Sequence, residues 1–176
     1  MKTQITLLLT GLLLSNLLWG KEKLEPVQVK SDELVIQVDG IVCSFCANGM
    51  ENNLSKLTFI DSSRFGDGVL IDINAHRTTL ALTKDKQPDL VGIYRAITKG
   101  GYDLKKVYFH LQGTLKQADG NYTLKDKYTG KSYILQAVPE NAAIGKAVTI
   151  KAHIDAESLA ALKPEQTISI IVDELI

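Results

Sequence analysis

The order in which the apolar pattern changes between strand and helix spacing is the strongest constraint on the fold of this chain. Between residues 33 and 112, segments that alternate with a two-residue period and segments with helical spacing follow one another as strand, helix, strand, strand, helix, strand. The expected elements are 33–38, 44–57, 69–74, 78–83, 90–97 and 107–111. This order predicts a ferredoxin-like βαββαβ domain, in which an antiparallel four-stranded sheet packs two helices on one face.

The remaining residues, 113–176, contain short strand-like segments separated by turn sequences. These segments are 113–118, 122–125, 132–138, 147–153 and 167–172, with a short helical stretch at 157–162 before the last of them. They predict a small all-β domain, either an OB-like barrel or a five-stranded meander. The expected fold class is therefore α+β, with a ferredoxin-like domain at 33–112 and a small β domain at 113–176.

The N-terminus has the features of an export signal. Lys2 precedes a leucine-rich run at residues 5–19, and Gly20 is a small residue suited to the position before a cleavage site. The run is shorter than the roughly 20 residues that a membrane-spanning helix needs, although an uncleaved anchor is the alternative. We expect a signal peptide at 1–20, a flexible lead at 21–32, and a periplasmic or secreted protein without stable membrane insertion after cleavage.

The charge balance excludes one class of partner. Lys and Arg together number 20, as do Asp and Glu, so the formal net charge is zero. Nucleic-acid-binding domains concentrate basic residues on one surface, and this composition offers no such excess. We therefore expect no nucleic-acid partner.

Cys43 and Cys46 are the only cysteines, and they lie where the first expected strand gives way to the first expected helix. A disulfide between them would close a very small loop and would add little stability, so the spacing favours a functional pair over a structural one. Two thiols at the start of a helix can hold a soft metal ion, or they can cycle between dithiol and disulfide.

Further residues around this pair carry a family resemblance. Residues 40–46 read Gly-Ile-Val-Cys-Ser-Phe-Cys, and Gly101-Tyr102 follows the second expected helix. The first expected helix carries Met50, Glu51, Leu54 and Leu57. On these motifs, residues 33–112 resemble the heavy-metal-associated domain family, which includes copper chaperones, metal-binding modules of metal-pumping ATPases and periplasmic mercury-binding proteins. The family signature is Gly-Met-x-Cys-x-x-Cys, so Ile41 replaces its usual methionine.

The resemblance implies roles for four residues. Cys43 and Cys46 would be the metal ligands, while Ile41 and Tyr102 would lie around them as a core plug and a shield. It also implies a partner, either a metal-pumping ATPase or another efflux or metal-handling protein. The protein would then carry, transfer or sense a metal ion rather than act as an enzyme, and we expect no catalytic residue.

The chemistry of the two thiol ligands narrows the choice of metal ion. Two thiolates with few other donors suit Cu(I), and by the same softness Ag(I) or Hg(II). Zn(II) normally takes four ligands, or three and a water, which makes it the less favoured ion. Zinc-selective members of the family often carry an acid immediately before the first cysteine, and Val42 stands there in this chain.

Two other functions remain open from the sequence. An exported Cys-x-x-Cys pair at a helix start also fits a thiol-disulfide redox protein. Ile41 and the long loop at 59–68 depart from the family pattern, which fits a structural or adaptor protein that has lost metal transfer.

Overall fold

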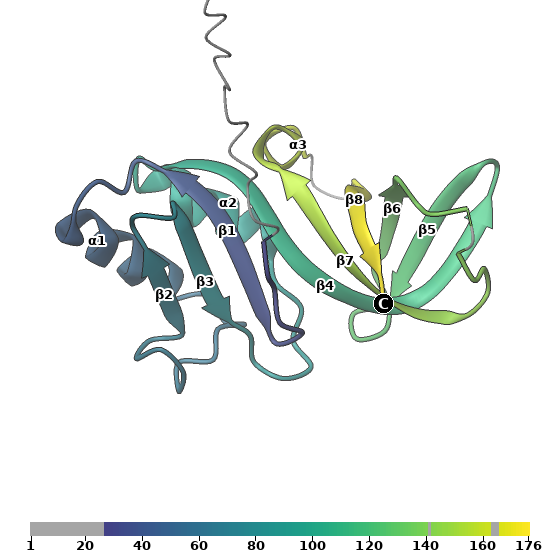
Figure 1. Cartoon of the computed structure of the whole chain (residues 1–176), viewed down its shortest axis with the longest axis horizontal. Helices are drawn as coiled ribbons and strands as arrows, with labels where there is room; N and C mark the ends of the chain where they lie inside the picture. The colour runs from purple at the N-terminus through teal and green to yellow at the C-terminus, as the bar shows by residue number, and fades with distance from the viewer. Residues whose placement is uncertain (1–26, 141, 163–165) are drawn as a thin grey trace, which may run out of the picture.

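The computed structural model describes residues 27–140, 142–162 and 166–176, and strands dominate it (Figure 1). The elements are β1 (Glu33–Asp39), α1 (Ser44–Leu54), β2 (Val69–Asp72), β3 (Arg77–Ala81), α2 (Leu90–Lys99), β4 (Asp103–Ala118), β5 (Asn121–Asp126), β6 (Ser132–Gln136), β7 (Ala147–Asp155), α3 (Ala156–Ala160) and β8 (Ile168–Leu175). Strand accounts for 42% and helix for 18%. The expected signal peptide at 1–20, and the lead as far as residue 26, lie outside the described residues.

The eight strands of the described residues belong to one sheet, in the order β2-β3-β1-β4-β5-β6-β8-β7. β4 also pairs with β7, which closes β4, β5, β6, β8 and β7 into a barrel. The pairing of β6 with β8 is parallel, and every other strand pair is antiparallel. β2, β3 and β1 extend the sheet beyond the barrel, and α1 and α2 lie beside this extension (Figure 1).

The predicted ferredoxin-like βαββαβ domain is wrong, because the molecule is a mostly-β closed barrel with additional strands. The six expected elements do occur in the expected order. The last of them, however, is a strand of 16 residues rather than the expected 107–111. Its first part pairs with β1, its middle with β7 and its end with β5, so the sheet continues into the barrel instead of ending near residue 112.

Gly113 explains why the continuation of β4 is hard to see in the sequence. A Cβ atom at this position would lie 2.2 Å from the Lys125 carbonyl oxygen and 2.6 Å from Leu124 Cδ2. The glycine therefore allows β5 to approach β4 closely, which is a recognised use of glycine inside a strand. In the sequence, Gly113 resembles a boundary between the two predicted domains. The division of the chain at 112/113 stays a prediction, and β4 runs across it.

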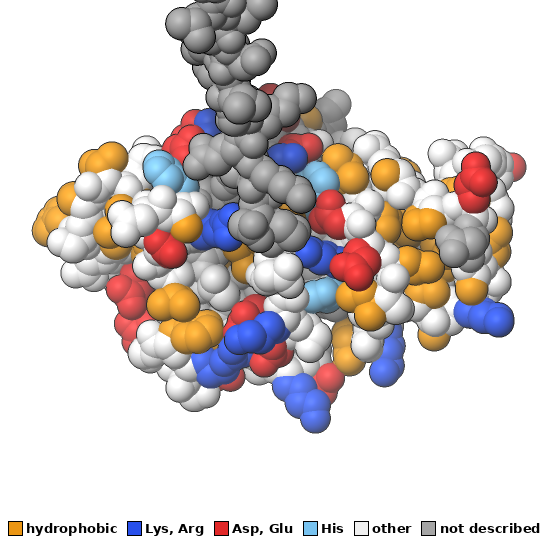
Figure 2. Space-filling model, in the orientation of Figure 1, with side chains coloured by type: hydrophobic (Ala, Val, Ile, Leu, Met, Phe, Trp, Pro, Cys, Tyr) orange, Lys and Arg blue, Asp and Glu red, His pale blue; other side chains and the backbone are white. Residues whose placement is uncertain are grey.

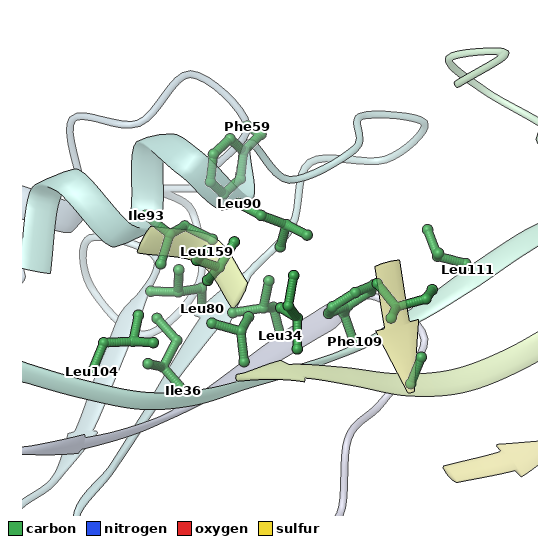
Figure 3. Close-up of a cluster of buried hydrophobic side chains, with 14 of the residues drawn as sticks. Leu34, Ile36, Phe59, Leu80, Leu90, Ile93, Leu104, Phe109, Leu111 and Leu159 are labelled. Carbon is green, nitrogen blue, oxygen red and sulfur yellow. The ribbon is translucent and has the colours of Figure 1, made fainter. Parts of the chain in front are cut away.

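The hydrophobic core is continuous across the molecule (Figure 3). Leu104, Phe109 and Leu111 of β4 line it from the helix-covered part to the barrel, each no more than 2% exposed. Leu159 of α3 belongs to the same buried cluster as Ile93 of α2, and α3 packs against α2. The helix-covered part and the barrel therefore share one hydrophobic core.

The barrel corrects one expectation for residues 113–176. The parallel pairing of β6 and β8 places the last strand beside the third strand of the barrel, which a simple meander does not do. The closed barrel is compatible with the OB-like alternative without establishing it. Among the described helices, none has both the length and the apolar character that a membrane crossing requires.

Candidate functional site

The cysteine loop connects the end of β1 to the start of α1. Gly40 has φ +92°, a conformation that glycine adopts at little cost, and it turns the chain out of the strand. Ile41 follows with only 2% of its surface exposed, so its side chain anchors the loop in the core. The chain then emerges at the surface with the two cysteines.

The two thiols lie together at the first turn of α1. Cys43 is the N-cap residue in an extended conformation, and its Sγ accepts a hydrogen bond from the Cys46 main-chain N–H at 3.3 Å. The two sulfur atoms are 2.9 Å apart, within hydrogen-bonding distance, and both cysteines are free. Cys43 is exposed, whereas Cys46 is half-buried and packs against the core.

These hydrogen bonds favour the thiolate form of Cys43. The Cys46 thiol is the main cause of a pKa of Cys43 below the ordinary thiol value, followed by the main-chain N–H of Cys46. Desolvation raises this pKa and opposes these two effects, and the N–H of Phe45 makes the smallest contribution, which lowers it. Thiolates are both the nucleophilic and the metal-binding form of cysteine, so Cys43 is prepared for either chemistry.

We expect the pH profile of Cys43 alkylation to depend on Cys46. In the wild-type protein the midpoint of the rate should lie below that of an ordinary thiol, and Cys46→Ala should move it upward because the main donor to the Cys43 sulfur is lost. Iodoacetamide labelling at a series of pH values, read by mass spectrometry of the Cys43 peptide, measures this. An unchanged midpoint in Cys46→Ala would contradict the assigned cause.

Tyr102 is attached to the main chain of the cysteine loop. It follows α2, and its hydroxyl donates a 2.7 Å hydrogen bond to the Cys46 carbonyl oxygen. Burial, and then the charges of Cys46 and Cys43, raise the pKa of Tyr102, so the hydroxyl keeps the proton that it donates. Tyr102 therefore holds the first turn of α1 against the end of α2, and this hydrogen bond goes to an oxygen rather than to a sulfur.

Two glycines leave room for the Tyr102 side chain. A Cβ at Gly49 would lie 2.9 Å from the tyrosine hydroxyl, and a Cβ at Gly100 would lie 2.6 Å from Cε2 of the ring. Gly49 is unfavourable in the middle of a helix, where glycine costs about 1 kcal/mol relative to alanine. The close approach of the Tyr102 hydroxyl explains why glycine stands at this helical position despite that cost.

Two large apolar side chains are exposed beside the thiols. Val42 and Phe45 are 80% and 85% exposed, so the side chains that flank Cys43 project into solvent. No charged residue occurs between positions 40 and 50. On the face shown in Figure 2, hydrophobic side chains gather at the left end of the molecule, where Figure 1 places α1. We call Val42, Cys43 and Phe45 the thiol tip.

Other nearby donors are engaged elsewhere. The Asp39 carboxylate pairs with His76 Nδ1 at 3.1 Å and Lys105 Nζ at 3.6 Å. Met50 is 1% exposed, and its sulfur accepts a hydrogen bond from the Thr78 hydroxyl at 3.5 Å. Within residues 27–140, 142–162 and 166–176, no three His, Cys, Asp or Glu side chains are grouped so that they could share a metal ion. The donors at the site are thus the two sulfur atoms.

Comparison of the chain with models of protein families, with curated proteins and with solved structures found no match. The resemblance to heavy-metal-associated domains therefore stays an interpretation of the motifs in residues 33–112. The functional conclusion rests on the geometry of the site itself.

Proposed function

We propose that the protein binds one soft metal ion, Cu(I) foremost, between Cys43 and Cys46, and that it carries, transfers or senses this ion. The observation that supports this function is the pair of free thiols, 2.9 Å apart at a helix start, with a Cys43 thiolate favoured by hydrogen bonds. Metal binding requires deprotonated sulfur, so a lowered thiol pKa reduces the competition from protons.

Binding an ion requires the sulfur atoms to move apart. With metal–sulfur bonds of about 2.3 Å, as for zinc, the two sulfurs would be about 3.8 Å apart in a tetrahedral arrangement and about 4.6 Å apart in a linear one. Cys43 is exposed and Cys46 packs against the core, so rotation of the Cys43 side chain is the simpler adjustment. The ion would replace the hydrogen bond between the sulfurs and release their protons.

The number and type of donors favour Cu(I), with Ag(I) and Hg(II) as chemical relatives. Two thiolates satisfy a soft monovalent ion, whereas structural Zn(II) sites complete four-coordination with further protein ligands. Asp39 and Met50 are the nearest alternatives in the sequence, and both are held in other contacts.

The thiol tip suits transfer to a partner. An exposed Cys43 between exposed Val42 and Phe45 allows another protein to bring its own soft ligands to the ion while it covers the apolar side chains. This partner would be a metal-pumping ATPase or another efflux or metal-handling protein. The predicted signal peptide would place the encounter in the periplasm or outside the cell, and the protein would act as a carrier and not as an enzyme.

The test is a Cu(I) titration of the reduced protein without its predicted signal peptide, in the absence of oxygen and against a chromophoric chelator. We expect one tightly held ion per chain, and loss of this binding in Cys43→Ser/Cys46→Ser. Ser44→Ala is the matched control, because it changes the same loop and leaves both sulfurs in place. Weak binding that is equal in the wild-type and double-variant proteins would exclude the metal-carrier function.

A thiol-disulfide redox function is the second candidate, and the 2.9 Å separation of the two sulfurs favours it. The Cys43 thiolate would attack a substrate disulfide and form a mixed disulfide, with one substrate sulfur leaving as a thiolate. Cys46, deprotonated, would then attack Cys43, so that the substrate ends as two thiols and the cysteine pair as a disulfide. Equal and weak Cu(I) binding in the titration would favour this candidate.

A further inference from the structure

A cleft of about 440 Å³ opens where one edge of β4 passes from β1 to β5. On this edge β1 pairs with β4 as far as Tyr108, and β5 begins to pair at Gly113. The residues of β4 between these two pairings, 110–112, line the cleft. Its volume falls in the range of about 300–1,000 Å³ that small-molecule sites occupy. We call it the polar cleft.

Uncharged polar side chains converge on the polar cleft. His110 and Gln112 stand on either side of Leu111 in β4, so their side chains leave the same face of the strand. Thr149 of β7 is the direct cross-strand partner of Gln112, and the side chains of such a pair lie on one face. Tyr128, in the turn after β5, reaches the same place, because its hydroxyl donates to the Gln112 side-chain oxygen at 3.4 Å. All four of these polar side chains line the cleft.

These side chains have hydrogen-bonding capacity that the protein does not use. Within the described part of the chain, the Gln112 side-chain nitrogen and the Thr149 hydroxyl have no hydrogen-bond partner. His110 Nδ1 donates to the Lys30 carbonyl oxygen at 3.2 Å, which leaves Nε2 of the neutral ring as an acceptor. The Tyr128 side chain adds an aromatic ring, and this residue is 44% exposed. The cleft thus offers donors, acceptors and an aromatic surface.

A buried carboxylate holds two walls of the cleft in place. Asp126 is 2% exposed, and it accepts hydrogen bonds from the N–H groups of Tyr128 and Thr129 and from the Thr129 hydroxyl. Its other oxygen accepts a 2.8 Å hydrogen bond from the side-chain nitrogen of Gln87, which also lines the cleft. The Gln87 side-chain oxygen is the one buried side-chain polar atom without a partner among the described residues. Buried polar atoms are normally paired, so this oxygen is a further unused acceptor.

The charges of the lining balance one another. Three acids and three bases contribute to it, namely Asp32, Asp61, Asp85, Arg64, Lys84 and Lys86. Arg64 pairs with Asp32 at 2.8 Å, and Lys86 Nζ donates to the Thr58 carbonyl oxygen at 2.9 Å. The lining therefore has no net charge that would favour an ionic ligand, and its polar groups do not suit a hydrocarbon.

We propose that the polar cleft binds a small uncharged saccharide. Its hydroxyl groups, each both a donor and an acceptor, pair with Gln112, His110 and Thr149. The apolar face of a sugar ring covers the ring of Tyr128. Lys127 Nζ lies 5.4 Å from the centre of that ring but Lys127 does not line the cleft, so the sugar takes the other face. The site does not include the cysteines, so this binding does not depend on metal loading.

The test is a titration of the ¹⁵N-labelled protein without its predicted signal peptide, followed by NMR, with glucose, galactose, N-acetylglucosamine and cellobiose as probes. We expect saturable shift changes of the His110, Gln112 and Thr149 amides with at least one probe. Gln112→Ala should weaken this binding about five- to tenfold, because a hydrogen bond is lost. Tyr128→Ala should also weaken it, because the aromatic surface is lost. Gln117→Ala is the matched control, since Gln117 is exposed on the same strand and does not line the cleft.

Four results would overturn the proposal. They are no saturable shift change with any of the four probes, shift changes away from the cleft, unchanged affinity in both Gln112→Ala and Tyr128→Ala, and equal affinity for glycerol, which has hydroxyl groups but no ring. Tighter binding of glucuronate or glucosamine than of glucose would contradict an uncharged ligand. Cys43→Ser/Cys46→Ser should bind the saccharide as the wild type does. Loss of Cu(I) binding and loss of saccharide binding are therefore separate outcomes.

Discussion

Phe109→Ala should lower the free energy of unfolding by about 3–5 kcal/mol, the usual cost of removing a fully buried phenylalanine. Phe109 is 1% exposed in the middle of β4, in the core that the helix-covered part and the barrel share. Its neighbours across the strands are on β7 as well as in the first part of the chain, so the cavity would weaken both. Urea unfolding, followed by circular dichroism, measures the change.

The same experiment tests whether the molecule unfolds as one unit. Hydrogen-exchange labelling at each urea concentration should give the same midpoint for peptides from β3 and from β6, and Phe109→Ala should shift both midpoints together. Phe45→Ala is the matched control, because Phe45 is 85% exposed and its removal should leave the midpoint near that of the wild type. Separate midpoints, with only one shifted by Phe109→Ala, would show that the two parts fold independently.

Gly113→Ala should destabilise the protein by about 3 kcal/mol, at the upper end of the usual cost of forcing extra atoms into a packed interior. The new Cβ would lie 2.2 Å from the Lys125 carbonyl oxygen, which belongs to the main chain of β5 and cannot rotate away. β4 and β5 would have to separate where Gly113 pairs with Asp126. The urea midpoint and the exchange protection of β5 measure this effect.

Gly92→Ala is the control for steric crowding at a glycine. Its Cβ would also meet an atom at short range, 2.6 Å away, but that atom is the Asp89 side-chain carboxylate oxygen, which can rotate away at the cost of the capping hydrogen bond that Asp89 accepts from the Gly92 N–H. Alanine is the better helix former by about 1 kcal/mol, which offsets the lost contact. We expect near wild-type stability for Gly92→Ala. Near wild-type stability for Gly113→Ala as well would mean that the two strands separate at little cost.

The local pattern of the sequence identifies the elements better than their assembly. Period and turn residues place β1, α1, β2, β3 and α2 close to their observed bounds, because each depends on neighbouring residues. The barrel depends on pairings between distant residues, such as Tyr133 with Ile168 and Lys106 with Asp155, which no local pattern contains. The ferredoxin-like prediction failed for this reason, since it assumed that the sheet was complete by residue 112.

The candidate site was predictable in its position and less so in its contacts. The strand-to-helix transition predicts that Cys43 and Cys46 share a loop, and the structure places their sulfurs 2.9 Å apart. The hydrogen bond from Tyr102 to the Cys46 carbonyl oxygen joins residues 56 positions apart and could not be derived from spacing. Gly49 was the available signal, since a glycine within a helix indicates close packing.

β4 also sets the reach of the molecule. Asp103 pairs with Asp39 beside the cysteine loop, and ten residues later Gly113 lies in the barrel, where it pairs with Asp126 of β5 and Val148 of β7. At about 3.3 Å per residue, the path along this curved part of the strand is roughly 33 Å (Figure 1), and it is hydrogen-bonded to neighbouring strands along the way. A strand held in this way is a rigid connection between the cysteine loop and the barrel, not a flexible linker. A protein or surface that binds the barrel would therefore hold the two sulfurs at a fixed distance and orientation relative to itself.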